Sequence, residues 1–201
     1  MKSTAFKCSS LLASLSLFFL STQTFATECT PGDTTAQECT ITKSDLTYTL
    51  TGNISTSEDD SYGIFLNLAD SNIINMTGNI ETSGEYSDGF YLHEADSNII
   101  TMTGDISTSA EDTDGFYLHE ADSNTINMIG NIETSGEYSN GFHLHGADSN
   151  IINMTGNIET SGEYSDGFHL DGADSNIITM IGNISTSGGG GFYLDGADSN
   201  I

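Results

Sequence analysis

Hydrophobic residues in most of this chain recur in short alternating runs, without the spacing of a helix. In residues 77–102, alternation puts Phe90 and Leu92 on one face of one run, and Ile100 and Met102 on one face of the next run. Alternation with a period of two over four to eight residues predicts β-strands that bury one face. The segments between the runs consist of Gly, Ser, Asp and Asn, which favour turns. We therefore predict three short strands in this stretch, at 78–83, 89–93 and 98–102.

The same pattern returns every 26 residues from Thr51 onward. Residues 77–102 and 155–180 are identical at 23 of 26 positions, and the last copy is two residues shorter. Self-similarity at a fixed period is typical of solenoids, and an even period returns each apolar position to the same face. The sequence therefore predicts an all-β fold, a parallel β-helix (β-solenoid) of roughly six 26-residue coils over residues 45–201.

Three kinds of residue also recur in columns at the coil spacing. We expect the asparagines to take the left-handed conformation at a corner, with each side-chain amide bonded to the next amide. We expect the glycines to occupy a turn that only glycine fits. By parity the threonines point inward or sit at a corner, which argues against the rival idea of an ice-binding face. The columns are Asn72, Asn98, Asn124, Asn150, Asn176 and Asn200; Gly63, Gly89, Gly115, Gly141, Gly167 and Gly191; and Thr56, Thr82, Thr108, Thr134, Thr160 and Thr186.

The first 26 residues differ from the rest of the chain. They begin with Lys2 and Lys7, continue with the apolar run 11–20, and end in small residues that fit a cleavage site at 24–26. This order is that of a secretory signal peptide, and the apolar run is too short for a membrane anchor, which takes about 20 residues. We therefore predict a signal peptide at 1–26 and a secreted mature chain.

The formal net charge is −26, from three basic and 29 acidic residues, and Lys43 is the only basic residue after the predicted signal peptide. Such a surface lacks the lysine and arginine side chains that would contact the phosphates of nucleic acids and anionic membranes. It also lacks arginine, which binds phosphoryl groups and acidic sugars. The composition therefore excludes nucleic acid as a partner and favours solubility, with repulsion between copies.

Cys29 and Cys39 lie upstream of the repeats, in a segment that also holds Pro31. In an oxidising compartment we expect a disulfide between them; the alternative is a zinc site, for which two cysteines without a nearby histidine supply half a ligand set. We assign residues 27–44 to an N-terminal cap over the open end of the β-helix. The repeats stop at Ile201 inside a copy, so we expect the repeat array to be truncated at the C-terminus.

A column of aspartates is the first candidate site. Carboxylates stacked at the coil spacing repel one another, and Ca²⁺, which takes several oxygen ligands, would relieve this repulsion. The chain lacks the spacing of an EF-hand and the glycine-rich nonapeptide of calcium-binding β-rolls. The interpretation we favour is an Asx-turn, in which each carboxylate accepts a hydrogen bond from its own backbone two residues on. The calcium candidates are Asp96, Asp122, Asp148 and Asp174, and no other cofactor is expected.

Outward tyrosines and histidines form the second candidate site. Aromatic residues with polar neighbours are typical of recognition surfaces for a protein or a glycan, but strand propensity alone also explains tyrosines on strands, and both interpretations stay open. A neighbouring column of His93, His119 and His145 suggests a metal site as an alternative, although later copies carry aspartate there. The candidate binding column is Tyr91, Tyr117, His143, His169 and Tyr193.

The repeated motifs Gly-Asn-Ile-x-Thr-Ser-Gly, Gly-Phe-x-Leu and Ala-Asp-Ser-Asn-Ile-Ile, behind a signal peptide, resemble the passenger domains of autotransporters of Gram-negative bacteria. The resemblance implies a β-helix on the cell surface, commonly an adhesin or a surface coat, exported through a C-terminal β-barrel in the outer membrane. The chain departs from this pattern, because no run of amphipathic strands of about ten residues follows the repeats. Anchoring in the outer membrane would require a barrel that this sequence lacks.

The sequence thus favours a secreted or surface-exposed β-helix passenger that acts as an adhesin or a structural stalk, with a host-cell protein or glycan as its partner. An active site needs unlike residues gathered in one place, and each coil here nearly repeats the last, so we expect no catalysis in the repeats. The alternative hypothesis is a fragment of a polysaccharide-active β-helix enzyme whose site lies in missing sequence.

Overall fold

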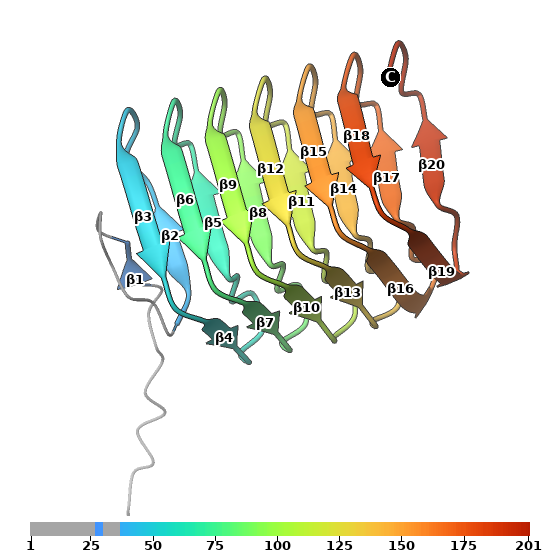
Figure 1. Cartoon of the computed structure of the whole chain (residues 1–201), viewed down its shortest axis with the longest axis horizontal. Helices are drawn as coiled ribbons and strands as arrows, with labels where there is room; N and C mark the ends of the chain where they lie inside the picture. Colours follow the sequence, from blue (N-terminus) through green and yellow to red (C-terminus); the bar gives the residue numbers. More distant parts are fainter. Residues whose placement is uncertain (1–26, 30–36) are drawn as a thin grey trace, which may run out of the picture.

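The computed structural model describes residues 27–29 and 37–201 (Figure 1). The predicted signal peptide and the middle of the predicted cap, residues 30–36, lie outside the described residues. The described chain consists of strands and turns, and no helix in it has the length and apolar character needed to cross a membrane. The chain winds into about six stacked coils, and corresponding strands of successive coils lie side by side in three sheets.

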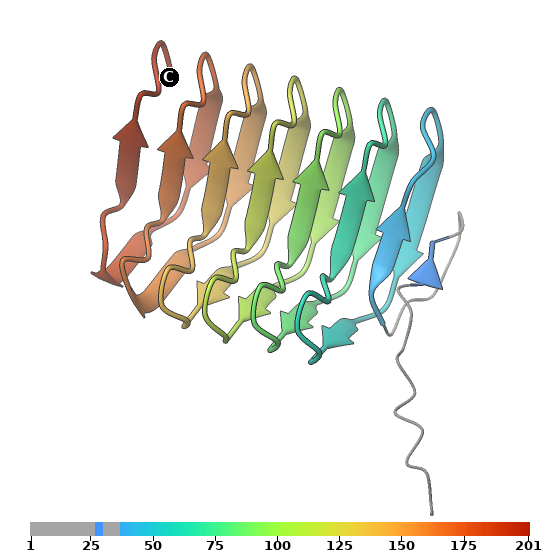
Figure 2. The same cartoon turned by 180° about the vertical axis from the view of Figure 1, so that it is seen from behind.

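Each full coil contributes one strand to each of the three sheets. Sheet A, which Figure 2 brings to the front, contains β1 (Thr27–Glu28), β2 (Cys39–Ile41), β5 (Ile64–Asn67), β8 (Phe90–His93), β11 (Phe116–His119), β14 (Phe142–His145), β17 (Phe168–Asp171) and β20 (Phe192–Asp195). Sheet B contains β3 (Thr47–Thr51), β6 (Ile73–Thr77), β9 (Ile99–Thr103), β12 (Thr125–Ile129), β15 (Ile151–Thr155) and β18 (Ile177–Ile181). Sheet C contains β4 (Ile54–Thr56), β7 (Ile80–Thr82), β10 (Ile106–Thr108), β13 (Ile132–Thr134), β16 (Ile158–Glu163) and β19 (Ile184–Gly188).

Every strand pairs in parallel with its counterpart one coil away, so that Phe116 lies opposite both Phe90 and Phe142. The shortened last copy keeps this order after a register shift between Thr160 and Glu163. The predicted strands at 78–83, 89–93 and 98–102 correspond to β7, β8 and β9. The structure therefore confirms the parallel β-solenoid with its 26-residue coil.

The interior of the coils holds the apolar columns that the alternation predicts. Phe90 and Leu92 from sheet A, and Ile100 and Met102 from sheet B, are fully buried. The inward phenylalanines stack from coil to coil with ring centroids 4.7 to 4.9 Å apart. Each such buried side chain contributes about 1.5–3 kcal/mol relative to exposure. The inward column of threonines is buried as well, except for Thr186 in the last coil, and Thr134 Oγ1 donates to the carbonyl oxygen of Ser139 at 2.7 Å.

The asparagine column holds the corner between sheets A and B through a contact that the sequence prediction described wrongly. The left-handed residue is the serine before the asparagine, as at Ser97 with φ 58° and Ser123 with φ 57°. Asn124 is fully buried, and its Oδ1 accepts a hydrogen bond from the backbone N–H of Asn98 at 2.8 Å. A buried backbone N–H needs an acceptor, and the side chain of the next coil supplies it at the corner. The ladder therefore runs from side chain to backbone and not from amide to amide.

The aspartate column also bonds between coils. Oδ1 of Asp96 accepts a hydrogen bond from the backbone N–H of Asp122 at 2.7 Å, and Oδ1 of Asp122 accepts one from Asp148 at 2.7 Å. The N–H two residues after Asp96, that of Asn98, donates to Asn124 instead. The predicted Asx-turn is therefore wrong, because coils about 4.8 Å apart bring a neighbouring N–H within reach of each carboxylate.

The glycine column before sheet A is required by packing and not by a turn. A Cβ at Gly115 would lie 2.5 Å from Cγ2 of Ile132 and 2.6 Å from the carbonyl oxygen of Gly141. No residue of this column has a positive φ, so the predicted reason is wrong. Glycines with a positive φ lie in two other turns, between sheets B and C, as at Gly104 with φ 140°, and between sheets A and B, as at Gly172 with φ 55°.

The N-terminal end of sheet A carries the two cysteines. Strand β1 pairs with β2, with Thr27 opposite Cys39, and β2 pairs in turn with β5. Cys29 and Cys39 are buried and form a disulfide, with their Cα atoms 5.2 Å apart. Strands β1 and β2 of the predicted cap therefore belong to sheet A, and the disulfide joins the two segments that carry them.

Candidate binding groove

The predicted binding column lies on the outer face of sheet A, with one residue from each of the strands β8, β11, β14, β17 and β20. Tyr91, Tyr117, His143 and His169 are half-buried, and their rings follow one another along the solenoid with centroids 4.8 to 5.0 Å apart; the first three rings are stacked, and His169 is tilted by 54° against His143. Tyr193 continues the stack 4.7 Å from His169. Because each ring lies against the next, the column presents ring edges and polar atoms to the outside more than ring faces.

A groove of about 600 Å³ runs along this column. One wall is the outer face of sheet A, and the other is formed by the loops that lead from sheet C into sheet A, below the strands of sheet A in Figure 2. Tyr193, the fifth residue of the predicted column, is not among its lining residues. The groove is lined by Asp60, Tyr62, Tyr86, Asp88, Tyr91, Asp112, Asp114, Tyr117, Tyr138, Asn140, His143, Tyr164 and His169.

Four of these lining residues are loop tyrosines that sequence reasoning missed: Tyr62, Tyr86, Tyr138 and Tyr164. Tyr86, Tyr138 and Tyr164 are 53%, 46% and 60% exposed, and all three have a left-handed backbone, with φ between 55° and 57°. Asp60 and Asp112 take the same place and the same conformation in other coils. A left-handed conformation costs a residue with a Cβ about 1–2 kcal/mol. The available signal was an aromatic residue inside a loop otherwise made of Gly, Ser, Asp and Glu.

A buried polar column closes the base of the groove. Asp88, Asp114, Asn140 and Asp166 are each at least nine-tenths buried, and each occupies the same place in its coil. Oδ1 of Asp88 accepts a hydrogen bond from the N–H of Asp114 at 2.7 Å, and Asn140 Oδ1 accepts one from the N–H of Asp166 at 2.8 Å. Tyr62 holds this place in the first coil. The column therefore joins the coils and also lines the groove.

Two histidines of the predicted column pair with this base. His143 Nδ1 lies 2.9 Å from Asp114 Oδ2, and His169 Nδ1 lies 3.1 Å from Asp166 Oδ2. Burial by itself lowers the pKa of His143, but the charge and hydrogen bond of Asp114, with the charges of Asp171 and Asp166, outweigh it and raise the pKa above its usual value. Burial raises the pKa of Asp88 well above its usual range, and the nearby charge of Asp114 adds to this.

The second histidine column lies on the same face but outside the groove. The rings of His93, His119 and His145 follow one another at 5.2 and 5.3 Å, and His145 Nδ1 lies 2.9 Å from Asp171 Oδ2. Burial, and then the charges of His93 and His145, lower the pKa of His119. Within the described residues, no three His, Cys, Asp or Glu side chains gather so as to hold a metal ion.

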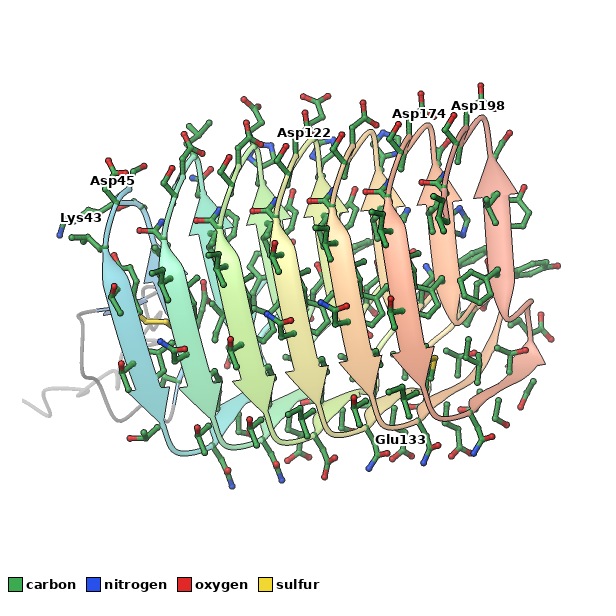
Figure 3. All side chains as sticks on the ribbon, turned by 45° about the horizontal axis from the view of Figure 1, so that its top comes forward. Lys43, Asp45, Asp122, Glu133, Asp174 and Asp198 are labelled. Carbon is green, nitrogen blue, oxygen red and sulfur yellow. A yellow bond between two sulfur atoms is a disulfide. The ribbon has the colours of Figure 1, made fainter. Side chains whose placement is uncertain are left out.

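The calcium candidates Asp96, Asp122, Asp148 and Asp174 lie at a different corner, between sheets A and B. Figure 3 shows Asp122 and Asp174 along one edge of the solenoid, with Glu133 along the opposite edge. One oxygen of each candidate already accepts a backbone N–H of the next coil, at 2.6 to 2.7 Å. The structure therefore separates these aspartates from the groove, which has its own acidic residues.

Comparison of the chain with protein-family models, with curated proteins and with solved structures finds no match. The fold is that of a β-solenoid repeat protein. An assignment of function therefore depends on the geometry and chemistry of the groove itself.

Proposed function

We propose that this chain is a secreted, surface-exposed β-helix passenger of the autotransporter type, which acts as an adhesin and binds a host-cell protein or glycan in the groove on sheet A. The observation that carries the proposal is the groove of about 600 Å³ lined by tyrosines, histidines and acidic residues of successive coils. Concave sites with aromatic walls and a few placed polar groups are the usual form of a binding site.

The loop tyrosines favour recognition over a purely structural stalk. Strand propensity can account for Tyr91 and Tyr117, which lie on β8 and β11. It cannot account for Tyr86, Tyr138 and Tyr164, which lie in loops and keep an unfavourable left-handed backbone. Strained residues of this kind persist where the surrounding structure holds them, and they cluster at functional sites. A stalk would be served better by asparagine or glycine at these positions.

Repetition of the groove along the solenoid suits adhesion. Successive coils present similar side chains at the coil spacing, so an extended ligand meets several weak contacts that act together through their effective concentration. The base carboxylates Asp114 and Asp166 are already paired with histidines, and we assign the groove to binding without catalysis. In this proposal the protein reaches the cell surface through a barrel encoded outside the given sequence.

The test replaces Tyr86, Tyr138 and Tyr164 together by asparagine, which tolerates the left-handed conformation. We expect the triple variant to fold as stably as the native protein but to lose most of its binding to host cells or to a glycan array, because the rim rings are gone. Binding is measured by flow cytometry and array fluorescence, and stability by thermal unfolding. The control is Asn127→Ala, on the outer face of sheet B.

Two outcomes would contradict the proposal. Equal binding by the native protein and the triple variant would exclude the groove as the recognition surface. Failure of the native protein to bind any cell or glycan at high surface density would leave the stalk role alone.

A further inference from the structure

The base of the groove contains one carboxylate whose second oxygen is left without a partner. Asp114 and Asp166 each place Oδ2 against a histidine, at 2.9 and 3.1 Å. Asp88 accepts a hydrogen bond on Oδ1 from the N–H of Asp114, and no described residue donates to its Oδ2. Asp114 and Asp166 pair with histidines on the outer face of sheet A. At the two equivalent positions beside Asp88 the chain has Tyr91 and Tyr117 instead.

This carboxylate is also deeply buried. Asp88 is only 4% exposed, yet it is one of the residues that line the groove. A buried charge without a counterion costs free energy, either as an unpaired charge or as an enforced protonation. The raised pKa of Asp88, caused by its burial and by the charge of Asp114, is the expected sign of that cost. A cation that entered the groove would remove it.

Aromatic residues line the groove together with Asp88. Tyr62, Tyr91 and Tyr117 form a continuous cluster, with ring centroids 4.9 Å apart for the first pair and 5.0 Å for the second. Tyr62, Tyr91 and Asp88 line the same groove, and burial, followed by the charge of Asp88, raises the pKa of both tyrosines. A buried carboxylate with a free oxygen attracts an organic ammonium ion, because a charge-assisted hydrogen bond would satisfy both groups.

The charge of the groove points to the same ligand class. Asp60 and Asp112 stand on the rim, and the groove lining contains no lysine or arginine. A calcium ion would need six to eight oxygen ligands, and the described residues offer no group of three acidic or histidine side chains for one metal. Sugar rings would stack on free aromatic faces, whereas Tyr91 and Tyr117 cover one another at 5.0 Å.

We propose that the groove binds the ammonium group of a lysine side chain from an extended basic segment of a partner protein, with Asp88 Oδ2 as its acceptor and Tyr62, Tyr91 and Tyr117 around it. This inference rests on the proposed function, because it names the partner class of the same groove. The acidic rim residues Asp60 and Asp112 receive further basic side chains of the same segment.

The experiment titrates the whole protein with a labelled eight-residue peptide of alternating lysine and serine, by fluorescence anisotropy at about 150 mM salt, where surface charges are screened beyond about 8 Å. Asp88→Asn is compared with the native protein and with Glu133→Gln. The first variant keeps the fold, because Asn140 occupies the same place in another coil. The second removes one exposed charge on sheet C, outside the groove (Figure 3).

We expect Asp88→Asn to weaken peptide binding at least about tenfold, as the loss of a charge-assisted hydrogen bond does. Glu133→Gln should change the affinity less than about twofold, because exposed charge pairs contribute little. The same peptide with its lysines acetylated should not bind, because acetylation removes the ammonium charge. Thermal unfolding checks that both variants fold.

Three results would overturn the inference. The first is equal weakening of peptide binding by both variants, which would mean attraction by net charge alone. The second is no binding of the peptide by the native protein at millimolar concentration. The third is that the protein binds a neutral oligosaccharide and not the peptide, and that Asp88→Asn leaves the oligosaccharide binding unchanged. The third result would leave the adhesin proposal standing. Conversely, peptide binding that depends on Asp88, in a protein that binds no cell, would support this inference and contradict the adhesin role.

Discussion

Single residues in this solenoid are constrained mainly by the coils above and below them, and glycine shows this most directly. Gly115 has no positive φ, yet an added Cβ would collide with Ile132 and with the backbone of Gly141. Gly172 has φ 55° and nothing within 4 Å of an added Cβ. Glutamate takes its place in an earlier coil, at Glu120 with φ 49°. Contact with the next coil, more than backbone conformation, therefore decides which glycine can be replaced.

We accordingly predict that Gly115→Ala lowers the free energy of unfolding by about 1–3 kcal/mol, because it overpacks the interior. Gly172→Ala should lower it by no more than about 1–2 kcal/mol, the cost of a left-handed conformation, and by less than Gly115→Ala does. Urea unfolding followed by circular dichroism measures both. An equal or larger loss at Gly172 would show that conformation and not packing governs these sites.

At the scale of elements, the strands of neighbouring coils are joined at their corners by side chains that replace backbone acceptors. The buried N–H of Asn98 donates to Asn124 Oδ1 at 2.8 Å, at the corner between sheets A and B. The N–H of Asn157 donates to Asn131 Oδ1 at 3.0 Å, at an exposed corner between sheets B and C. The two bonds have the same chemistry, but water can replace only the second.

The two corners should therefore respond differently to removal of the side chain. Asn124→Ala leaves the N–H of Asn98 buried without an acceptor and should cost about 1–3 kcal/mol of unfolding free energy. Asn131→Ala should change it by less than about 0.5 kcal/mol, as is usual at exposed positions. Equilibrium urea unfolding of the two variants compares them. Losses of similar size would refute the argument that burial sets the value of these bonds.

The whole molecule carries an excess of negative charge, with a formal net charge of −26 and an isoelectric point near 4.1. Mutual repulsion of the acidic residues opposes the compact state at neutral pH. The raised pKa values of Asp88 and His143 act in the same direction. For both groups the folded state holds a proton more tightly than the unfolded chain, so their contribution to stability is lost as the pH rises through the folded pKa.

We predict that the unfolding temperature rises as the pH is lowered from 8 to about 5. The protonation of His143 contributes fully below its unfolded pKa of about 6.5, and the protonation of Asp88 and the relief of charge repulsion act in the same direction. Thermal scans at several pH values and two salt concentrations measure the effect. Asp88→Asn should make the dependence on pH shallower, and a native protein more stable at pH 8 than at pH 5 would contradict the prediction.

The sequence alone predicted the architecture, because the side-chain period of a strand is two and the repeat is even. Phe90 and Leu92 had to share a face, and the same face had to return in every coil. The outward stack of Tyr91 and Tyr117 follows from the same parity. The columns of asparagine, aspartate and glycine were also visible in the sequence, but their roles were not, since these depend on which atoms of the neighbouring coil lie within reach.

Only the tertiary structure decided where the groove lies. A loop residue has no parity, so alternation could not show that Tyr86 faces the outer column of sheet A. Its position follows from its left-handed backbone and from the stacking of the loops. The stack of coils likewise decides which buried carboxylates are paired. Asp114 and Asp166 each have a histidine partner, whereas Asp88 has none. Strand periodicity thus determined the coil from local sequence, while contacts between coils, at a separation of 26 residues, determined the chemistry of the surface.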